Sequence, residues 1–294
     1  MNGFLVIDKP GGMTSRDVVN RVQRWFPRGT KVGHTGTLDP LATGVLVLCV
    51  GAATRLADIV QGMGKSYTSR FRLGATSDTD DADGAVTEAA GVTPPTEEQV
   101  RAALAGFVGT IEQLPPAYSA LKVNGRRAHE LARRGDAVPL AARPVRVDAI
   151  RLQAYEWPFA DVEVDCGKGT YIRSLARDVG TRLGVGGLVQ TLRRTRVGPF
   201  TAEQGVGLDA TPEEARMKLL PMATAVQGMT RDDLNEDDVK RFRQGQLIQR
   251  PPRPGALLPD QRWVAVFGPD RVTLIGLASQ DPCFRLKPEV VLPE

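Results

Sequence analysis

A single carboxylate, that of Asp39, stands within a segment of glycines and small polar residues, Lys31–Gly44. Pro40 follows it and biases its backbone toward an extended or turn conformation. Three glycines in the same segment allow backbone angles that other residues avoid. The pattern indicates a rigid loop that offers one acid to a ligand, and such a carboxylate can act as a nucleophile. The alternative is a surface turn, because Asp-Pro and Gly-Thr are common turn pairs.

Regular elements are predicted on both sides of this loop and further along the chain. Val45–Val50 has the length and β-branched content of a buried strand, and Tyr67–Leu73 alternates like a half-buried strand. Residues 170–183 place apolar side chains at the spacing of one buried helical stripe. Arg173 lies near the first turn of that helix, where its guanidinium can reach a neighbouring loop. An exposed helical arginine is the alternative.

Length and composition limit the class of protein. With 294 residues, 41% of them hydrophobic, the chain is predicted to form one large or two moderate globular domains. It contains no apolar run of about 18 residues and no secretory leader, so we expect a cytoplasmic protein without a membrane span. Three distant cysteines and two histidines argue against a zinc site or a disulfide framework. We therefore expect no metal site.

The net charge of +4 is modest, but the basic residues are concentrated in two regions, 121–151 and 166–200. Acidic residues cluster instead at Asp78–Asp83. A basic face beside an acidic one suits a polyanion such as RNA. Solvated helix faces are the alternative explanation, because charged runs commonly form them.

The loop sequence from Gly33 to Gly44 resembles the catalytic loop of the TruB family of tRNA pseudouridine synthases, Gly-His-x-Gly-Thr-Leu-Asp-Pro-x-Ala-x-Gly, at every position. Further blocks match in the order of the family. They are Asp8–Ser15, Lys65–Tyr67, Gly74–Gly84, Gln113–Lys122, Gly167–Leu175 and Leu192–Thr195. The resemblance covers residues 3 to about 200 and is weak beyond them.

The resemblance implies an α+β fold. Its central sheet is expected to be mixed and largely antiparallel, with flanking helices, as in the pseudouridine synthase fold. We expect this catalytic domain to comprise residues 1–230. After residue 255 short strands recur between turns, which indicates a β-rich module and resembles the PUA domain of the family. We assign it to residues 231–294 as an RNA-binding domain.

The resemblance also implies the reaction, the conversion of uridine-55 in the T arm of tRNA to pseudouridine. This isomerisation breaks the N1–C1′ bond and rejoins the base through C5, without an oxidant, nucleotide or metal. The resemblance therefore implies no other cofactor either. Asp39 corresponds to the nucleophile of the family, and Arg173 to its cationic partner. Tyr67 corresponds to the tyrosine that stacks on the everted uracil and is a candidate acceptor of the C5 proton. Whether Asp39 attacks C6 or assists at C1′ stays open.

Other positions correspond to residues that contact the RNA. His34 matches the histidine that helps to hold the RNA loop open, and Lys9 and Leu192 match residues that line the active site. Candidate phosphate contacts are Lys122, Arg126, Arg127, Lys168, Arg193 and Arg194. The expected partner is the T stem-loop of tRNA. No protein partner or membrane is implied, and we expect a monomer.

Parts of the sequence also suggest two functions other than pseudouridine formation. A non-catalytic RNA-binding protein or tRNA-folding chaperone on the same scaffold would need the basic surface but not Asp39. A P-loop nucleotide hydrolase is suggested by Gly64-Lys65-Ser66, yet the first glycine of that motif would fall at Ile59, so the motif fails.

Overall fold

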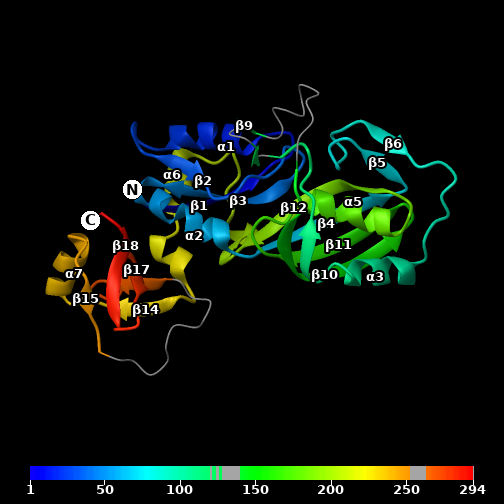
Figure 1. The fold of residues 1–294 in the computed structure, drawn as a ribbon. Helices are drawn as coiled ribbons and strands as arrows, with labels where there is room; N and C mark the ends of the chain where they lie inside the picture. The colour runs from blue at the N-terminus through cyan, green and yellow to red at the C-terminus, as the bar shows by residue number, and fades with distance from the viewer. Residues whose placement is uncertain (120, 124–125, 128–139, 252–262, 294) are drawn as a thin grey trace.

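The computed structural model describes residues 1–119, 121–123, 126–127, 140–251 and 263–293. Within them, a nine-stranded sheet is the centre of the larger part of the molecule (Figure 1). Its main path runs β1 (Gly3–Lys9), β3 (Thr43–Val50), β12 (Gly187–Val197), β4 (Lys65–Leu73), β11 (Phe159–Cys166), β10 (Arg143–Glu156) and β7 (Gly109–Gln113). β2 (Val32–His34) pairs with β3, and β13 (Phe200–Thr201) pairs with β12.

The pairing pattern of this sheet confirms the predicted fold class. Its strand pairs are antiparallel except for the short parallel contact between β12 and β3, where Arg193 lies opposite Thr43 and Arg194 opposite Gly44. A Cβ added to Gly44 would lie 2.2 Å from the carbonyl oxygen of Arg194, and Gly44 has φ +95°. Only glycine therefore fits where the end of the loop meets β12.

Helices flank this sheet. Figure 1 shows α3 (Glu97–Ala105) and α5 (Ile172–Arg182) beside its β4–β10 half, and α1 (Ser15–Val22) beside β1 and β2. α2 (Ala57–Gly62) and α6 (Pro212–Met217) are the other α-helices among the described residues of this part, with 3₁₀ turns at Gln23–Trp25, Gly51–Leu56, Ala202–Gln204 and Met222–Val226. Two small hairpins stand apart from the sheet. They are β5 (Ala75–Ser77) with β6 (Val86–Glu88), and β8 (Lys122–Val123) with β9 (Arg126–Arg127).

The β1–β3 end of the sheet is buried on both faces. Leu46, Leu48 and Val50 pack into the core beneath α1 and α5, whereas Val45 and Val47 face a second apolar cluster. This explains why the predicted strand reads as a continuous apolar run. β4 has one buried face, with Tyr67, Ser69, Phe71 and Leu73 inward, as its alternating sequence predicts.

The C-terminal part of the chain forms a five-stranded sheet. Its order is β14 (Thr230–Asp233), β16 (Val264–Phe267), β17 (Leu274–Gln280), β18 (Arg285–Val291) and β15 (Ile248–Gln249). The predicted β-rich module is thus present. It also contains a helix that we did not predict, α7 (Glu236–Arg243), which Asn235 caps and which buries Val239 and Phe242. The domain boundary at residue 230 stays a prediction.

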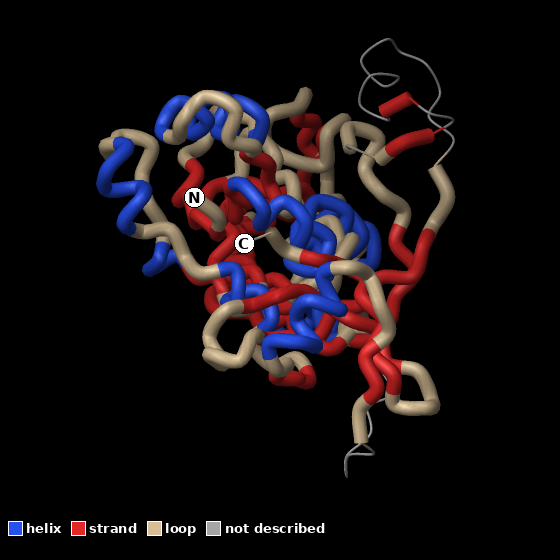
Figure 2. Tube along the Cα trace, turned by 90° about the vertical axis from the view of Figure 1, so that its left-hand side faces the viewer, coloured by secondary structure: helices blue, strands red, loops and turns tan. Residues whose placement is uncertain are grey.

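The two sheets share the second apolar cluster. Phe4 and Val6 of β1 contribute to it from one side, and Phe267 of β16 with Leu274 and Leu277 of β17 contribute from the other. Figure 2, like Figure 1, shows the N- and C-termini close together, and Met1 and Pro293 line one surface hollow. Among the described residues, no helix has the length and apolar character needed to cross a membrane.

Candidate active site

The loop between β2 and β3 carries Asp39 at the centre of the sheet. Leu38 and Ala42 anchor it by burying their side chains on either side of the carboxylate. The hydroxyl of Ser15 accepts a hydrogen bond from the Leu38 N–H at 2.8 Å and donates to the Leu38 carbonyl at 3.1 Å. Thr35 donates its N–H to the carbonyl of Val47 at 3.0 Å. The loop is therefore held from its interior, in contrast to an ordinary surface turn.

Arg173 and Asp39 form a two-pronged ion pair. Nε of Arg173 donates to Oδ2 of Asp39 at 2.9 Å, and Nη2 donates to Oδ1 at 3.1 Å. The guanidinium also donates to the backbone carbonyls of Thr79 and Tyr118, at 2.8 and 2.9 Å. Such bidentate, charge-assisted contacts fix both distance and orientation. The pairing that we predicted is thus present, and the exposed alternative for Arg173 is wrong.

The two partners differ in their access to solvent. The side chain of Arg173 is 4% exposed, whereas that of Asp39 is 32% exposed. The arginine lies beneath the carboxylate and leaves part of it open toward a cavity. A carboxylate held in this way is oriented from below and accessible to a ligand from above.

Asp81 is a second carboxylate beside the same guanidinium, and we did not predict it as a site residue. Its Oδ2 lies 3.5 Å from Nε of Arg173, and its side chain is buried. Burial raises the pKa of Asp81, while a 2.6 Å hydrogen bond from the Thr79 hydroxyl and the charge of Arg173 act in the opposite direction. The sequence signals for it were the matching block Gly74–Gly84 and the acidic cluster Asp78–Asp83, and neither distinguished it from its neighbours.

The acidic run Asp78–Asp83 does not form the exposed acidic face that its charge pattern suggested. Besides the contact of Asp81 with Arg173, Asp80 pairs with Arg177 of α5 at 2.8 Å. The run folds against the first turns of α5, so part of its charge is used within the protein.

A cavity of about 300 Å³ opens beside Asp39. Tyr67 and Leu192 line it from neighbouring strands, as do Lys168 and Tyr171 from the segment before α5. Burial raises the pKa of Tyr67, so its phenol retains the proton at neutral pH. The cavity therefore combines one accessible carboxylate, two aromatic side chains, and a lining of apolar residues mixed with basic and polar ones. The aromatic and apolar side chains suit a flat, uncharged ring.

Lys65 lines the same cavity, although we did not predict it as a site residue. Its sequence signal was the matching block Lys65–Tyr67. Its amine donates to the carbonyls of Gln61 and Met63 at 3.0 and 2.8 Å. Burial, reinforced by the nearby charge of Arg194, lowers the pKa of Lys65 to about 8. Lys65 thus joins the end of α2 to the first residue of β4, two positions before Tyr67.

Two residues predicted to contact RNA are instead buried beneath the loop. Lys9 donates to the carbonyls of Pro10, Met13 and Pro40, at 2.8, 2.8 and 3.2 Å. Arg194 donates to the carbonyl of Gly36 in the loop and to that of Val45 in β3, and it is 2% exposed where it lines the cavity. Neither position suits the contact that we expected, because all of these donors already have protein acceptors.

The remaining predicted residues lie at varied positions. Lys168 is exposed at the cavity, and Leu192 is buried in its wall. Arg193 is half-exposed and forms a two-pronged pair with Asp8, with both contacts at 2.9 Å. His34 ends β2, next to the loop. The side chains of three residues, Lys122, Arg126 and Arg127, lie outside the described part of the structure, although their backbones form β8 and β9.

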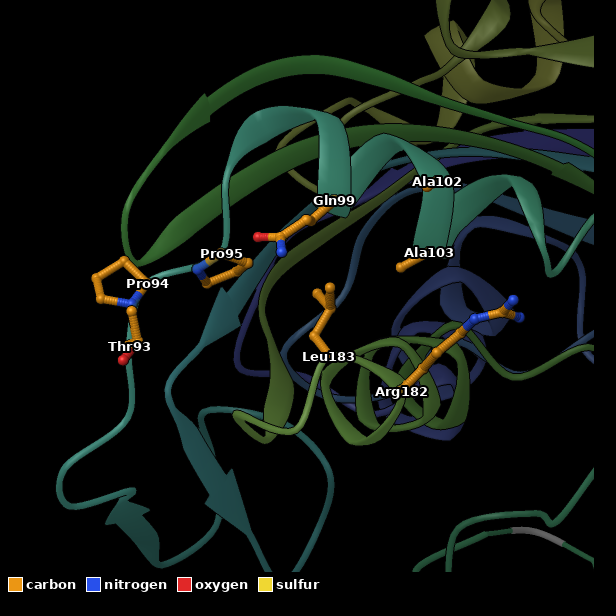
Figure 3. Close-up of a pocket in the computed structure, with 8 residues that line it drawn as sticks. All are labelled: Thr93, Pro94, Pro95, Gln99, Ala102, Ala103, Arg182 and Leu183. Atoms are coloured by element: carbon orange, nitrogen blue, oxygen red, sulfur yellow. The ribbon is translucent and has the colours of Figure 1, made fainter.

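A larger hollow elsewhere shows that size alone does not identify the site. About 450 Å³ lies between the segment before α3, α3 itself and the end of α5, as Figure 3 shows. Pro94, Pro95 and Ala103 contribute much of its wall, and Arg182 is the one charged lining residue among those described. No carboxylate lines it, whereas the smaller cavity contains Asp39.

Comparison with known families gives two matches that together span most of the chain. Residues 24–172 match the family described as TruB family pseudouridylate synthase (N terminal domain). Residues 173–227 match the tRNA pseudouridylate synthase B C-terminal domain. The junction between the two matches falls between Ile172 and Arg173, at the start of α5.

Curated relatives and solved structures agree with these matches. A tRNA pseudouridine synthase B of Xanthomonas euvesicatoria pv. vesicatoria (strain 85-10) is 43% identical over 98% of this chain and 93% of its own length. One of Mycobacterium sp. (strain KMS) is 47% identical over 84% of each chain. Among solved structures, a Cbf5-Nop10-Gar1 complex matches with a TM-score of 0.74 and 25% identity, covering 99% of this chain and 84% of the other.

Proposed function

This chain belongs to the TruB family of pseudouridylate synthases, and we propose that it isomerises uridine-55 in the T arm of tRNA to pseudouridine with Asp39 as the nucleophile. The observation that carries the proposal is the two-pronged pair of Asp39 with Arg173 at the cavity that Tyr67 lines. The relatives' names supply tRNA as the substrate class.

Three side chains have separate roles in the proposed reaction. Asp39 offers its carboxylate to the nucleoside once the glycosidic bond weakens, as a carboxylate does in retaining glycosidases. Arg173 holds that carboxylate in one orientation and neutralises its charge in a partly desolvated position. Tyr67 stacks on the uracil, which must leave the RNA stack before it can enter the cavity. Stacking contributes about 1–3 kcal/mol per base.

The last step of the isomerisation removes a proton from C5 after C5 has bonded to C1′. Tyr67 is our candidate acceptor. Because burial raises its pKa, the phenol can accept this proton only as it passes its own proton to water at the cavity. N1, freed from C1′, takes up a proton from water, so the isomerisation balances. Both routes for Asp39, addition at C6 and assistance at C1′, are compatible with this step.

RNA contacts beyond the nucleoside come from the surface around the cavity. Lys168 is exposed there, and this exposure supports it as a phosphate contact. We also propose that residues 231–294 act as a PUA-like module that extends the contact with tRNA. We expect the enzyme to act as a monomer, which sedimentation of the protein with and without tRNA tests.

The experiment is a comparison of wild-type protein and Asp39→Asn on unmodified tRNA. Pseudouridine is mapped by chemical probing, and binding is measured separately on the same tRNA. We expect position 55 to be converted by the wild type only, with tRNA affinity equal for both proteins. A tRNA with cytidine at position 55 is the substrate control. Conversion by Asp39→Asn would refute Asp39 as the nucleophile.

A non-catalytic RNA chaperone on the same scaffold predicts a different result. It requires no conversion by the wild type, and Asp39→Asn would assist tRNA folding as well as the wild type does. The partly exposed carboxylate beside a cavity favours the enzyme, since a chaperone has no need of an oriented acid.

A further inference from the structure

We propose that Arg194 is a positioning residue of the reaction, one that holds the backbone on both sides of Asp39, and that it is not a contact to RNA phosphate. The inference deepens the proposed function and rests on it. It concerns a residue outside the ion pair of Asp39 with Arg173, one that also acts on Tyr67 by lowering the pKa of its phenol against the effect of burial.

The guanidinium of Arg194 spans the two ends of the loop. Its Nη2 donates to the carbonyl of Gly36 at 3.1 Å and its Nη1 to that of Thr37 at 3.4 Å, both before Asp39. Its Nε donates to the carbonyl of Val45 at 2.7 Å, after the loop has entered β3. One planar group therefore fixes the distance between the entry and the exit of the loop.

Arg194 completes a continuous set of backbone contacts. The carbonyls of Leu38 and Pro40 accept from side chains of Ser15 and Lys9, and that of Asp39 accepts from the Ala42 N–H at 3.1 Å. All five carbonyls from residue 36 to residue 40 thus accept a hydrogen bond. Among the described residues, Arg194 is the donor to the two carbonyls that precede Leu38, those of Gly36 and Thr37. Its removal would therefore free the segment that leads into Asp39.

The backbone of Arg194 is itself held closely against the loop. It lies opposite Gly44 in the parallel contact of β12 with β3, and on its other side it lies opposite Tyr67 of β4. A Cβ at Gly44 would collide with its carbonyl. The side chain therefore starts from a fixed point between the loop and the stacking tyrosine, and it lines the cavity from there.

Burial of the Arg194 side chain removes its positive charge from water, which costs free energy. Its residue is 2% exposed, and within the described residues it forms no ion pair with a carboxylate. Burial of a charge is unfavourable unless dipoles or counter-charges compensate it, and an apolar side chain of similar volume often stabilises as well. The precise placement of three carbonyls is what an apolar residue could not provide.

The test measures kcat, KM and tRNA binding for Arg194→Lys and Arg194→Met. Lysine keeps the charge but has a single nitrogen, which cannot reach carbonyls at both ends of the loop. We expect kcat to fall about a hundredfold for Arg194→Met, as small misplacements of a reacting group do, and by less for Arg194→Lys. KM and the tRNA dissociation constant should stay within about twofold of wild type, because no phosphate contact is lost.

Salt dependence separates positioning from phosphate binding. Loss of one phosphate contact lowers the slope of log K against log salt concentration by about 1. We expect an unchanged slope for both Arg194 variants. The matched control is Arg196→Met, the same change on the same strand, at a half-exposed side chain that donates to Ser66 at 2.9 Å. It should leave kcat at the wild-type value.

Each outcome decides the proposal. A weaker affinity with a smaller salt slope and an unchanged kcat would establish a phosphate contact and overturn it, as would wild-type kcat in Arg194→Lys and Arg194→Met. Thermal unfolding shows whether each variant is folded, and Arg194→Lys provides the test if Arg194→Met is not. Failure of the wild type to convert tRNA would instead refute the proposed function itself.

Discussion

Nε and Nη2 of Arg173 meet the two carboxylate oxygens of Asp39 at 2.9 and 3.1 Å, from a position beneath the carboxylate that solvent hardly reaches. The arginine belongs to the first turn of α5, and the acid to a loop 134 residues earlier in the chain. Helix and loop are therefore joined at one point, the carboxylate proposed to react.

Arg173→Lys should reduce kcat about a hundredfold while tRNA affinity is retained. Lysine keeps the charge but cannot form two parallel contacts, so the carboxylate loses its orientation. Single-turnover conversion of tRNA measures the effect. Arg177→Lys, one turn along the same helix, is the control, because Arg177 pairs with Asp80 and Asp178 and does not contact Asp39. Equal losses in the two variants would assign the effect to the helix and not to the pair.

Asp81→Asn should lower kcat about tenfold, which corresponds to about 1.4 kcal/mol of transition-state stabilisation. The asparagine keeps the shape and can still accept from Thr79, but it removes the second negative charge beside Arg173. The guanidinium then keeps its hydrogen bonds to Asp39 and to the carbonyls of Thr79 and Tyr118, but it loses one of its two charged neighbours. Asp80→Asn is the matched change at the neighbouring carboxylate. An unaltered kcat in Asp81→Asn would show that the charge of Asp81 does not contribute to orienting the arginine.

Substitutions of Tyr67 should separate stacking from proton transfer. Tyr67→Phe retains the ring, so we expect wild-type KM with a kcat reduced at least tenfold, because the hydroxyl proposed to accept the C5 proton is lost. Tyr67→Leu removes the ring and should also raise KM. Steady-state kinetics on the T stem-loop measures both. Full activity of Tyr67→Phe would exclude the phenol as the proton acceptor.

Above pH 8, Lys9 should make the free energy of unfolding increase with pH. Burial lowers the pKa of Lys9 to about 8, whereas an unfolded lysine titrates near 10.5. Between these values the unfolded chain binds more protons than the folded one, so this group makes the free energy of unfolding rise with pH. Below pH 8 the contribution is constant.

Urea unfolding of wild type and Lys9→Met at pH 8 and pH 10 measures this contribution. The stability of wild type relative to the variant should be greater at pH 10 than at pH 8. A difference that is the same at both pH values, or smaller at pH 10, would show that the pKa of Lys9 is not lowered.

The local sequence pattern was sufficient to predict the helices and strands whose buried face is visible in their own sequence. The alternation of Tyr67–Leu73 and the apolar stripe after residue 170 correspond to β4 and α5 because strand and helix periods place side chains directly. The helix α7 was missed because its sequence is almost entirely charged, and only Val239 and Phe242 face the core.

Burial of polar groups could not be predicted in the same way. Arg193 and Arg194 are adjacent and chemically identical, and strand geometry says only that they face opposite sides. Which one is buried depends on the carbonyls of a loop about 150 residues away. The same holds for Asp81, whose burial depends on Arg173 of a distant helix.

The apolar cluster shared by the two sheets fixes the distance between them. Phe267 and Leu277 would be exposed to water if the C-terminal sheet swung away from β1 and β3, which hydrophobic burial opposes. The distance from Asp39 to the strands of the C-terminal sheet is therefore held by apolar burial. An RNA that contacts both parts, as we propose, has to match that distance, so selection among RNAs can depend on their dimensions as well as on their sequence.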